Sequence, residues 1–284
     1  MLSDAAHVRL RGAFMRRIVV ASDLSERSDR AIERALRLSS ELGAACRVVS
    51  IVDNSLPEDL ASELKVSTEK RLRDLLDAHK GRQAEIDVRS GDIAAGVLGI
   101  AAETEADLLV LGLHRRRAFM DTVRETTVER IVALSRRPVL LVHDPVNAPY
   151  SRVLVPVSYS TACASAITAA RQIAPEAELS PFHALHVPFS GLTGGKLSDL
   201  AHAVRRETEE LAREWMATHA VSGEAPEIVA GSIHQVMDRM LQSVKPDLMA
   251  IGAHTRSGIG FHRIGAFAAE LIREPPVDLL VTRA

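Results

Sequence analysis

The chain has 284 residues, of which 46% are hydrophobic and 25% are charged, as in a globular protein that can build real cores. A formal net charge of −2 and an aromatic content of 3% give little attraction for nucleic acid or anionic membranes, so neither is expected as a partner. The two cysteines, Cys46 and Cys163, lack CxxC spacing, and no apolar run is long enough to span a bilayer. We therefore expect a cytoplasmic protein without a disulfide framework, a zinc site or a membrane span.

The first half of the chain alternates apolar strands with amphipathic helices. The strands are mostly continuous runs of Val, Ile and Leu, a pattern that indicates burial on both faces of a parallel sheet. Ser25 and Asp92 are predicted helix N-caps. The predicted buried stripe of the second helix consists of Leu60, Leu64, Leu72, Leu75 and Leu76. The predicted strands are 17–22, 47–52, 85–89, 107–111 and 138–142, and the predicted helices are 27–42, 58–79, 93–104 and 125–135.

The second half of the chain repeats the first. RRIVVASDLSERSDRAIERAL (16–36) corresponds to SRVLVPVSYSTACASAITAA (151–170), and DLLVLGLHRR (107–116) returns as DLMAIGAHTR (247–256). RRPVLLV (136–142) returns likewise as PPVDLLV (275–281), and the helix equivalent to 58–79 is marked by Leu197, Leu200, Val204, Leu211 and Trp215. With a linker near 143–151, the sequence predicts two doubly wound α/β domains, at 15–146 and 150–284.

The fifth strand of each half is an apolar sheet edge, and an exposed edge of this kind invites aggregation unless it is paired. We therefore expect 138–142 to pair with 277–281 in antiparallel fashion, which makes the two halves an internal pseudo-two-fold pair.

Ligands of doubly wound sheets bind beyond the carboxyl ends of the strands. A carboxylate there can accept hydrogen bonds from a ribose hydroxyl or an adenine amine, and a helix N-terminus attracts phosphate. Asp23 suits a helix-capping turn equally well. The arginines 115–117 fit a solvated surface patch better than a phosphate site. Catalytic groupings and metal-binding clusters do not stand out in the sequence. The candidate ligand-binding residues are Ala21, Ser22, Asp23, Ile51, Gly112, Arg115, Thr126 and Thr127 in the first half, and Pro156, Val157, Val187, Gly252, Ala253, Gly265 and Ala266 in the second.

The repeated unit resembles the universal stress protein family in its tandem arrangement. The opening stretch at 16–36 is similar to the first strand, turn and helix of the family, and the two closing stretches are similar to its second half. The resemblance implies an adenine-nucleotide alpha-hydrolase-like fold with a five-stranded parallel sheet of order 3-2-1-4-5, in domains that pair through the last strand.

Family members that bind ATP carry G-x-x-G, nine residues and then G-S/T, with an aspartate after the first strand, and both halves depart from this motif. The first half keeps Asp23, Gly112 and Thr126, but Arg115 and Glu125 stand where the second and third glycines are expected. The second half keeps Gly252 and Gly265, but it has Thr255, Ala266 and Ser158 where a glycine, a hydroxyl residue and the aspartate are expected.

The resemblance implies a non-enzymatic stress-response protein that acts through protein partners and can pair as a homodimer of the tandem chain. Its broken motifs imply weak binding of ATP or another adenine nucleotide, with Mg²⁺ only as a companion of the nucleotide. A slow ATPase using the same site and a ligand-free scaffold are the alternatives. Within 112–131, we expect the Glu125 carboxylate at the start of a helix to occupy or repel the phosphate position.

Overall fold

The computed structural model describes residues 15–79, 83–113, 126–186, 195–253, 255–256 and 263–283. The first half alternates strands and helices along the whole of its length, as the sequence predicts. Its elements are β1 (Arg17–Ala21), α1 (Glu26–Leu42), β2 (Ala45–Asp53), α2 (Glu58–Ala78), β3 (Glu85–Gly91), α3 (Ile93–Glu103), β4 (Leu108–Gly112), α4 (Thr127–Leu134) and β5 (Val139–Val142).

The second half repeats this order and adds a short hairpin after its fourth strand. Its elements are β6 (Arg152–Pro156), α5 (Thr161–Ile173), β7 (Glu178–Leu185), α6 (Gly195–Thr218), β8 (Glu227–Ala230), α7 (Ile233–Val244), β9 (Leu248–Ala253), the hairpin strands β10 (Thr255–Arg256) and β11 (Arg263–Ile264), α8 (Ala266–Arg273) and β12 (Asp278–Arg283).

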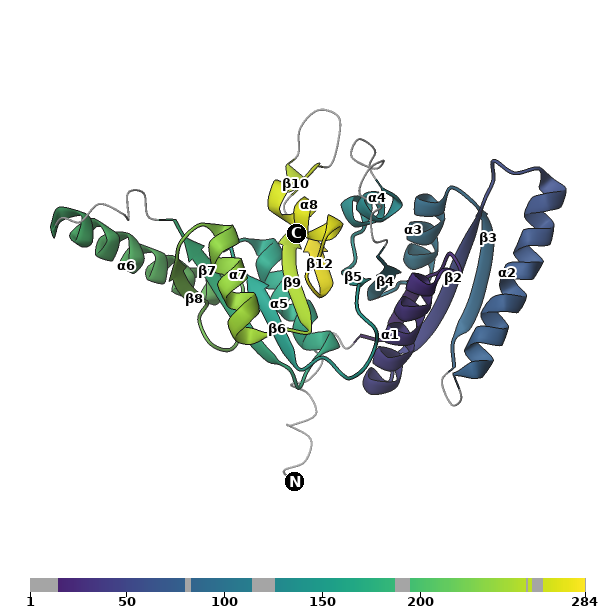
Figure 1. The fold of residues 1–284 in the computed structure, drawn as a ribbon, viewed down its shortest axis with the longest axis horizontal. Helices are drawn as coiled ribbons and strands as arrows, with labels where there is room; N and C mark the ends of the chain where they lie inside the picture. The colour runs from purple at the N-terminus through teal and green to yellow at the C-terminus, as the bar shows by residue number, and fades with distance from the viewer. Residues whose placement is uncertain are drawn as a thin grey trace, which may run out of the picture.

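One ten-stranded sheet runs through both halves in the order β3-β2-β1-β4-β5-β12-β9-β6-β7-β8. Each half therefore has the predicted order 3-2-1-4-5, and the two halves extend in opposite directions from the junction (Figure 1). Within this sheet the strands of each half are parallel, whereas β5 and β12 pair antiparallel with Leu140 opposite Leu280. This pairing confirms the predicted pseudo-two-fold arrangement of the fifth strands.

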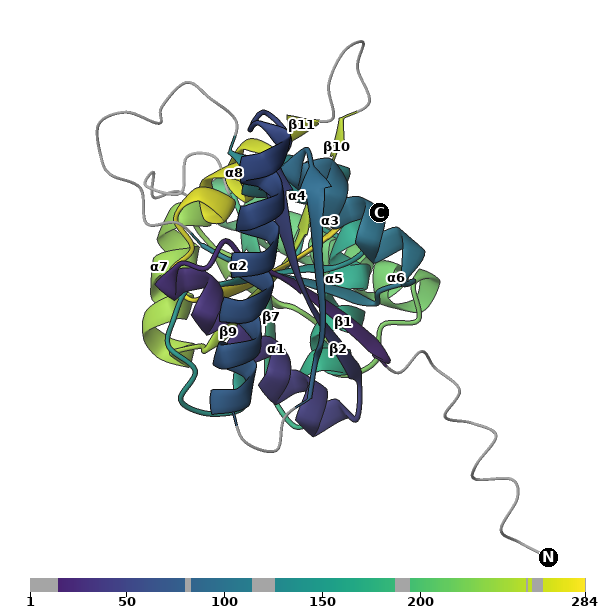
Figure 2. The same ribbon diagram turned by 90° about the vertical axis from the view of Figure 1, so that its right-hand side faces the viewer.

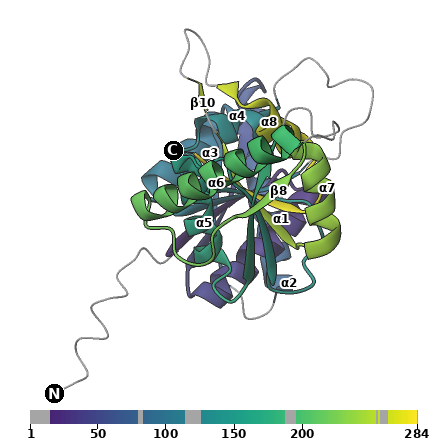
Figure 3. The ribbon, with the colours of Figure 1, turned by 90° about the vertical axis from the view of Figure 1, so that its left-hand side faces the viewer.

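Helices cover both faces of the sheet, and each face has one hydrophobic core that continues across the junction. Val20 and Val155 belong to the core beneath α1, α2, α5 and α6, while Val19 and Leu154 belong to the core beneath α3, α4, α7 and α8. Viewed from the first-half end, α2 lies in front of the sheet (Figure 2). From the other end, α6 and α7 lie in front (Figure 3). Neither core belongs to one half alone.

The predicted buried stripes of the two outer helices are partly wrong. Leu72 and Leu76 of α2 are buried, but Leu60 and Leu64 are 47% and 45% exposed. α2 packs on β2 and β3 at the end of the sheet, and three of its four buried residues, Thr68, Leu72 and Leu76, lie at or beyond the midpoint of the helix. In α6, Trp215 is buried and Leu211 is 49% exposed. Val204 is partly buried, and the side chains of Leu197 and Leu200 lie outside the described residues.

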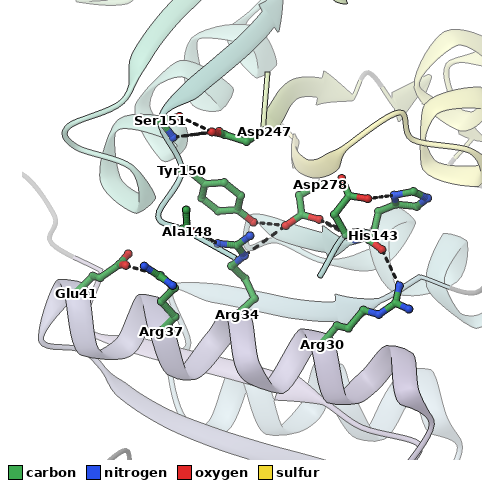
Figure 4. Close-up of polar contacts among 11 residues, drawn as sticks. Arg30, Arg34, Arg37, Glu41, His143, Ala148, Tyr150, Ser151, Asp247 and Asp278 are labelled. Carbon is green, nitrogen blue, oxygen red and sulfur yellow. Dashed lines mark hydrogen bonds and ion pairs between the residues drawn. The ribbon is translucent and has the colours of Figure 1, made fainter. Parts of the chain in front are cut away.

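A buried polar network holds the two halves together at the junction (Figure 4). The Asp278 carboxylate of β12 is 1% exposed and lies 3.4 Å from Nε of Arg34 on α1. Tyr150 donates its hydroxyl to Asp278 at 2.6 Å, and the backbone N–H groups of His143 and Asp144 donate to the other carboxylate oxygen. Burial and the Asp278 charge raise the pKa of Tyr150, so Tyr150 stays protonated and keeps this hydrogen bond. The carboxylate is thus satisfied from several sides.

The junction network is present on one side of the pseudo-two-fold axis. Strand pairing makes Pro138 the counterpart of Asp278, since Val139 pairs with β4 as Leu279 pairs with β9. Counting from the N-caps of α1 and α5 makes Ala169 the counterpart of Arg34. The halves are therefore alike in fold but different in the charges that they bring to the junction.

Among the helices of the described residues, not one has the length and hydropathy needed to cross a bilayer.

Candidate nucleotide site

A cavity of about 370 Å³ opens at the carboxyl ends of β1, β2 and β4 in the first half. The strand order reverses between β1 and β4, which is where ligands of doubly wound sheets bind. The predicted residues Ala21, Ser22, Asp23, Ile51, Gly112, Thr126 and Thr127 all line this cavity. The structure therefore brings together the three stretches that the sequence singles out, while ligand binding by these residues stays a prediction. Arg115 lies outside the described residues.

Asp23 sits in the turn between β1 and α1, next to Leu24 in a left-handed conformation. Its Oδ1 accepts hydrogen bonds from the backbone N–H of Ser25 at 3.0 Å and from the Ser25 hydroxyl at 2.5 Å. Burial opposes ionisation of Asp23, but hydrogen bonds from Ser25 and Ser28 outweigh it and hold the pKa below its usual range. Asp23 is thus an ionised turn residue that also borders the cavity, while Ser25 is the predicted N-cap of α1.

Gly112, the last residue of β4, is required by the packing of the strand against α1. A Cβ at this position would lie 2.5 Å from the carbonyl oxygen of Arg27 and 2.9 Å from the backbone nitrogen of Ser28. Gly252 is in the same situation in the second half, where a Cβ would lie 2.4 Å from the backbone nitrogen of Cys163. Both glycines therefore allow a close approach of the strand to the protein's own backbone.

The N-terminus of α4 forms one wall of the cavity and is closed by a capping box. The Thr126 hydroxyl accepts from the backbone N–H of Glu129 at 3.1 Å, and the Glu129 carboxylate accepts from the backbone N–H of Thr126 at 2.7 Å. The other Glu129 oxygen accepts from Nε of Arg273, the last residue of α8, at 2.5 Å. Burial would raise the pKa of Glu129, but these hydrogen bonds and the Arg273 charge outweigh burial and lower it. Glu129 is therefore ionised and engaged on both oxygens.

The start of α4 differs from the predicted one. The helix begins at Thr127 with Thr126 as N-cap, later than the predicted start at 125. The N-cap of α8 is Gly265, which the sequence places opposite Glu125. The buried residues Ile131 and Val132 of α4 and Leu271 and Ile272 of α8 keep this correspondence, as do Val139 and Leu279 in the fifth strands. The two helices therefore have N-caps that differ by one residue within the predicted correspondence. Glu125 lies outside the described residues, so the expectation that its carboxylate blocks the phosphate position stays a prediction.

The end of the first strand in the second half is more filled than in the first. Phe182 pairs with Pro156 as Val49 pairs with Ala21, so a fully buried phenylalanine takes the place of the valine that lines the cavity. Pro156, Val157 and Ala253 are buried, and Gly252 is partly buried.

The remaining candidates of the second half are Gly265, Ala266 and Val187. Next to Ser158, the ring of Tyr159 stacks on His183 at a centroid distance of 4.5 Å. Gly265 caps α8 with nothing within 4 Å of a Cβ built there. Ala266 lines a hollow over α8 together with Arg273. Val187 lies outside the described residues.

Several cavity residues were missed by the sequence analysis, for two different reasons. The spacing Thr126-x-x-Glu129 is a capping-box signature that could have been found, and Ile93 and Val97 follow the N-cap Asp92 on one helix face. Ile272 and Arg273 belong to the other half, so only the pairing of the two halves brings them to the site. The missed residues are Ser25, Arg27, Ser28, Val49, Ile93, Val97, Leu111, Leu113, Val128, Glu129, Ile131, Ile272 and Arg273.

These features define a tandem pair of doubly wound α/β domains with a cavity at the switch point of the first. A sequence model described as the universal stress protein family matches residues 15–143 and again residues 149–283. The chain therefore belongs to the universal stress protein family and contains two copies of the family's unit.

Solved structures of the family share the fold of the whole chain. A universal stress protein from Archaeoglobus fulgidus DSM 4304 is 18% identical, with a TM-score of 0.66 over 94% of this chain and 98% of that one. A putative universal stress protein from Pseudomonas aeruginosa UCBPP-PA14 is 16% identical, with a TM-score of 0.64 over 95% of this chain and 94% of that one. A comparison with curated protein sequences finds no match.

Proposed function

We propose that the chain is a cytoplasmic stress-response protein that binds an adenine nucleotide in the cavity of its first half and acts through protein partners. The observation that carries this proposal is the cavity itself, of about 370 Å³, at the switch point between β1 and β4. This size lies in the range of ordinary small-molecule sites, about 300–1,000 Å³. Family membership supports the stress-response role.

The walls of the cavity suit the two ends of a nucleotide. Ile51, Ile93 and Val97 provide an apolar surface for a flat base. Asp23 is an ionised acceptor beside them and matches a ribose hydroxyl or an adenine amine. Thr127 and Val128, in the first turn of α4, border the cavity where the helix dipole favours phosphate.

We expect this cavity to bind a nucleotide weakly, because groups of the protein already occupy part of the position that a phosphate would take. The backbone N–H of Thr126 donates to Glu129, and the Glu129 carboxylate brings a negative charge to the same helix end. A nucleotide phosphate would share the remaining positive potential with this carboxylate. The second half is the weaker candidate, since it has Ser158 for Asp23 and Phe182 for Val49.

The proposal makes this a binding site without catalysis. A general base works best with a pKa near the operating pH. The pKa values of Asp23 and Glu129, two carboxylates of the cavity, are lowered, and both groups are held by hydrogen bonds from the protein. Both are therefore poor proton acceptors for a water that attacks phosphate.

Calorimetric titration of ATP into the full chain and into Asp23→Asn tests the proposal. Loss of one hydrogen bond to a charged group costs about 1.5–3 kcal/mol, so the variant is expected to bind at least about tenfold more weakly. Ser158→Ala, at the equivalent turn of the second half, is the matched control and should leave the affinity unchanged. Saturable binding without phosphate release in the presence of Mg²⁺ is the expected result. No binding by the wild type, or turnover of ATP, would contradict the proposal.

A further inference from the structure

We infer that the first-half cavity is a two-domain site, in which Arg273 of the second half selects ligands that carry phosphate. The inference rests on the proposed function, namely nucleotide binding in this cavity. It goes further by assigning the preference for phosphate to a residue of the opposite half.

The end of α8 reaches the cavity from across the junction. Ile272 and Arg273, its last two residues, line the cavity together with the first turn of α4. The Arg273 side chain is 50% exposed and contacts Glu129, whose side chain is 8% exposed. The Arg273 guanidinium is therefore fixed on its inner side and open to solvent on its outer side.

The chemistry of this arginine fits a phosphate. A guanidinium has five N–H donors arranged as a fork, which matches phosphate oxygens in a bidentate manner. Arg273 uses Nε for Glu129, and among the residues that the structure describes its two terminal nitrogens make no other hydrogen bond or ion pair. Glu129 holds the arginine beside the N-terminus of α4, where a nucleotide phosphate would lie. A phosphate there meets a helix N-terminus and an oriented cation at the same time.

At the positions equivalent to Glu129 and Arg273, the other ends of the two helices carry no ion pair. In the register that relates Val139 to Leu279, the counterpart of Glu129 is Ala269 and the counterpart of Arg273 is Ala133. Ala133 is buried in α4 and can neither pair with a carboxylate nor bind phosphate. The second half thus contributes an arginine to the site of the first, and the equivalent position of α4 offers no such arginine in return.

Calorimetry of the full chain with two probes, ATP and adenosine, tests the inference. Arg273→Gln is expected to weaken ATP binding about tenfold, as for the loss of one charged hydrogen bond, and to leave adenosine binding unchanged. Arg205→Gln removes an exposed arginine of α6 that pairs with Glu209, and this control should change neither affinity. Unchanged ATP affinity in Arg273→Gln, or equal weakening for ATP and adenosine, would overturn the inference.

A second variant separates ligand recognition from the loss of the Glu129 contact. Glu129→Gln with Arg273→Gln replaces the ion pair by two neutral amides, so no buried carboxylate is left alone. Compared with Glu129→Gln alone, this double variant should bind ATP about tenfold more weakly and adenosine equally well, and equal ATP affinity of the two would overturn the inference. If the wild type binds neither probe, the proposed function fails and the inference fails with it. If the wild type binds ATP and both variants bind it equally well, only the inference fails.

Discussion

Gly112 and Gly252, at the ends of β4 and β9, are required by the packing of these strands against the next helix. At Gly112 and Gly252 the neighbours of an added Cβ are backbone atoms of the first turn of α1 or α5, which cannot rotate away. A glycine here is needed whether or not a ligand binds nearby. The presence of both glycines therefore supports the fold, and evidence for a ligand must come from Asp23, the cavity and the helix N-terminus.

Gly112→Ala should destabilise the protein by about 1–3 kcal/mol, the usual cost of overpacking a tight contact. Gly99→Ala is the matched control, because it lies within α3 with nothing within 4 Å of the added Cβ. It should raise the free energy of unfolding by up to about 1 kcal/mol, since alanine is the better helix former. Urea denaturation of the two variants measures both effects. Equal stability of Gly112→Ala and the wild type would show that the strand and α1 can move apart.

At the scale of elements, the sequence predicts what is repeated and buried. The apolar runs at 17–22 and 107–111 predict central parallel strands because both of their faces are covered, and the structure has β1 and β4 there. The apolar fifth strands predict their own pairing because an open edge is unfavourable. Burial and repetition are local properties, so they can be found in the chain itself.

Other features of the elements depend on contacts between elements that are far apart in the sequence. Leu60 and Leu64 have helical spacing for a buried stripe, yet their exposure depends on how much of α2 the end of the sheet can cover. Contacts between Arg273 and Glu129 join residues that are 144 positions apart and in different halves. The seven predicted cavity residues of the first half come from strand ends and a helix start. Arg273 belongs to the site because the fold places α4 and α8 side by side, which the sequence does not indicate.

The contact between α1 and β12 allows a test of the buried ion pair in Figure 4. Asp278→Leu should cost about 3–5 kcal/mol, because Arg34 would then be a buried charge without its carboxylate. The double variant Arg34→Met with Asp278→Leu should cost much less, since it removes both charges. Urea denaturation gives the free energy of unfolding of each variant.

The control for this test is the pair of Arg37 and Glu41, which lies on the same helix and is more exposed. Glu41→Gln should change the stability by no more than about 0.5 kcal/mol. If Asp278→Leu is as mild as Glu41→Gln, water reaches Arg34 and the network contributes little.

At the scale of the whole molecule, each half depends on the other to cover a sheet edge. Residues 1–146, which we propose contain the complete first domain, should form a homodimer or a poorly soluble protein when expressed alone, because β5 would lose β12. The full chain is the control. Size-exclusion chromatography with light scattering over a range of concentrations measures the oligomeric state. A soluble monomer at high concentration would show that β5 needs no partner.

The one-sided position of the Arg34 and Asp278 pair determines which halves can recognise each other. Two first halves joined through β5 would bury two Arg34 side chains opposite Pro138, and two second halves would bury two Asp278 carboxylates opposite Ala169. Only the mixed combination neutralises both charges at this junction. The two repeats therefore pair like the different subunits of a heterodimer, although they belong to one chain. The charges at the junction, as well as the linker, determine that each half pairs with the other.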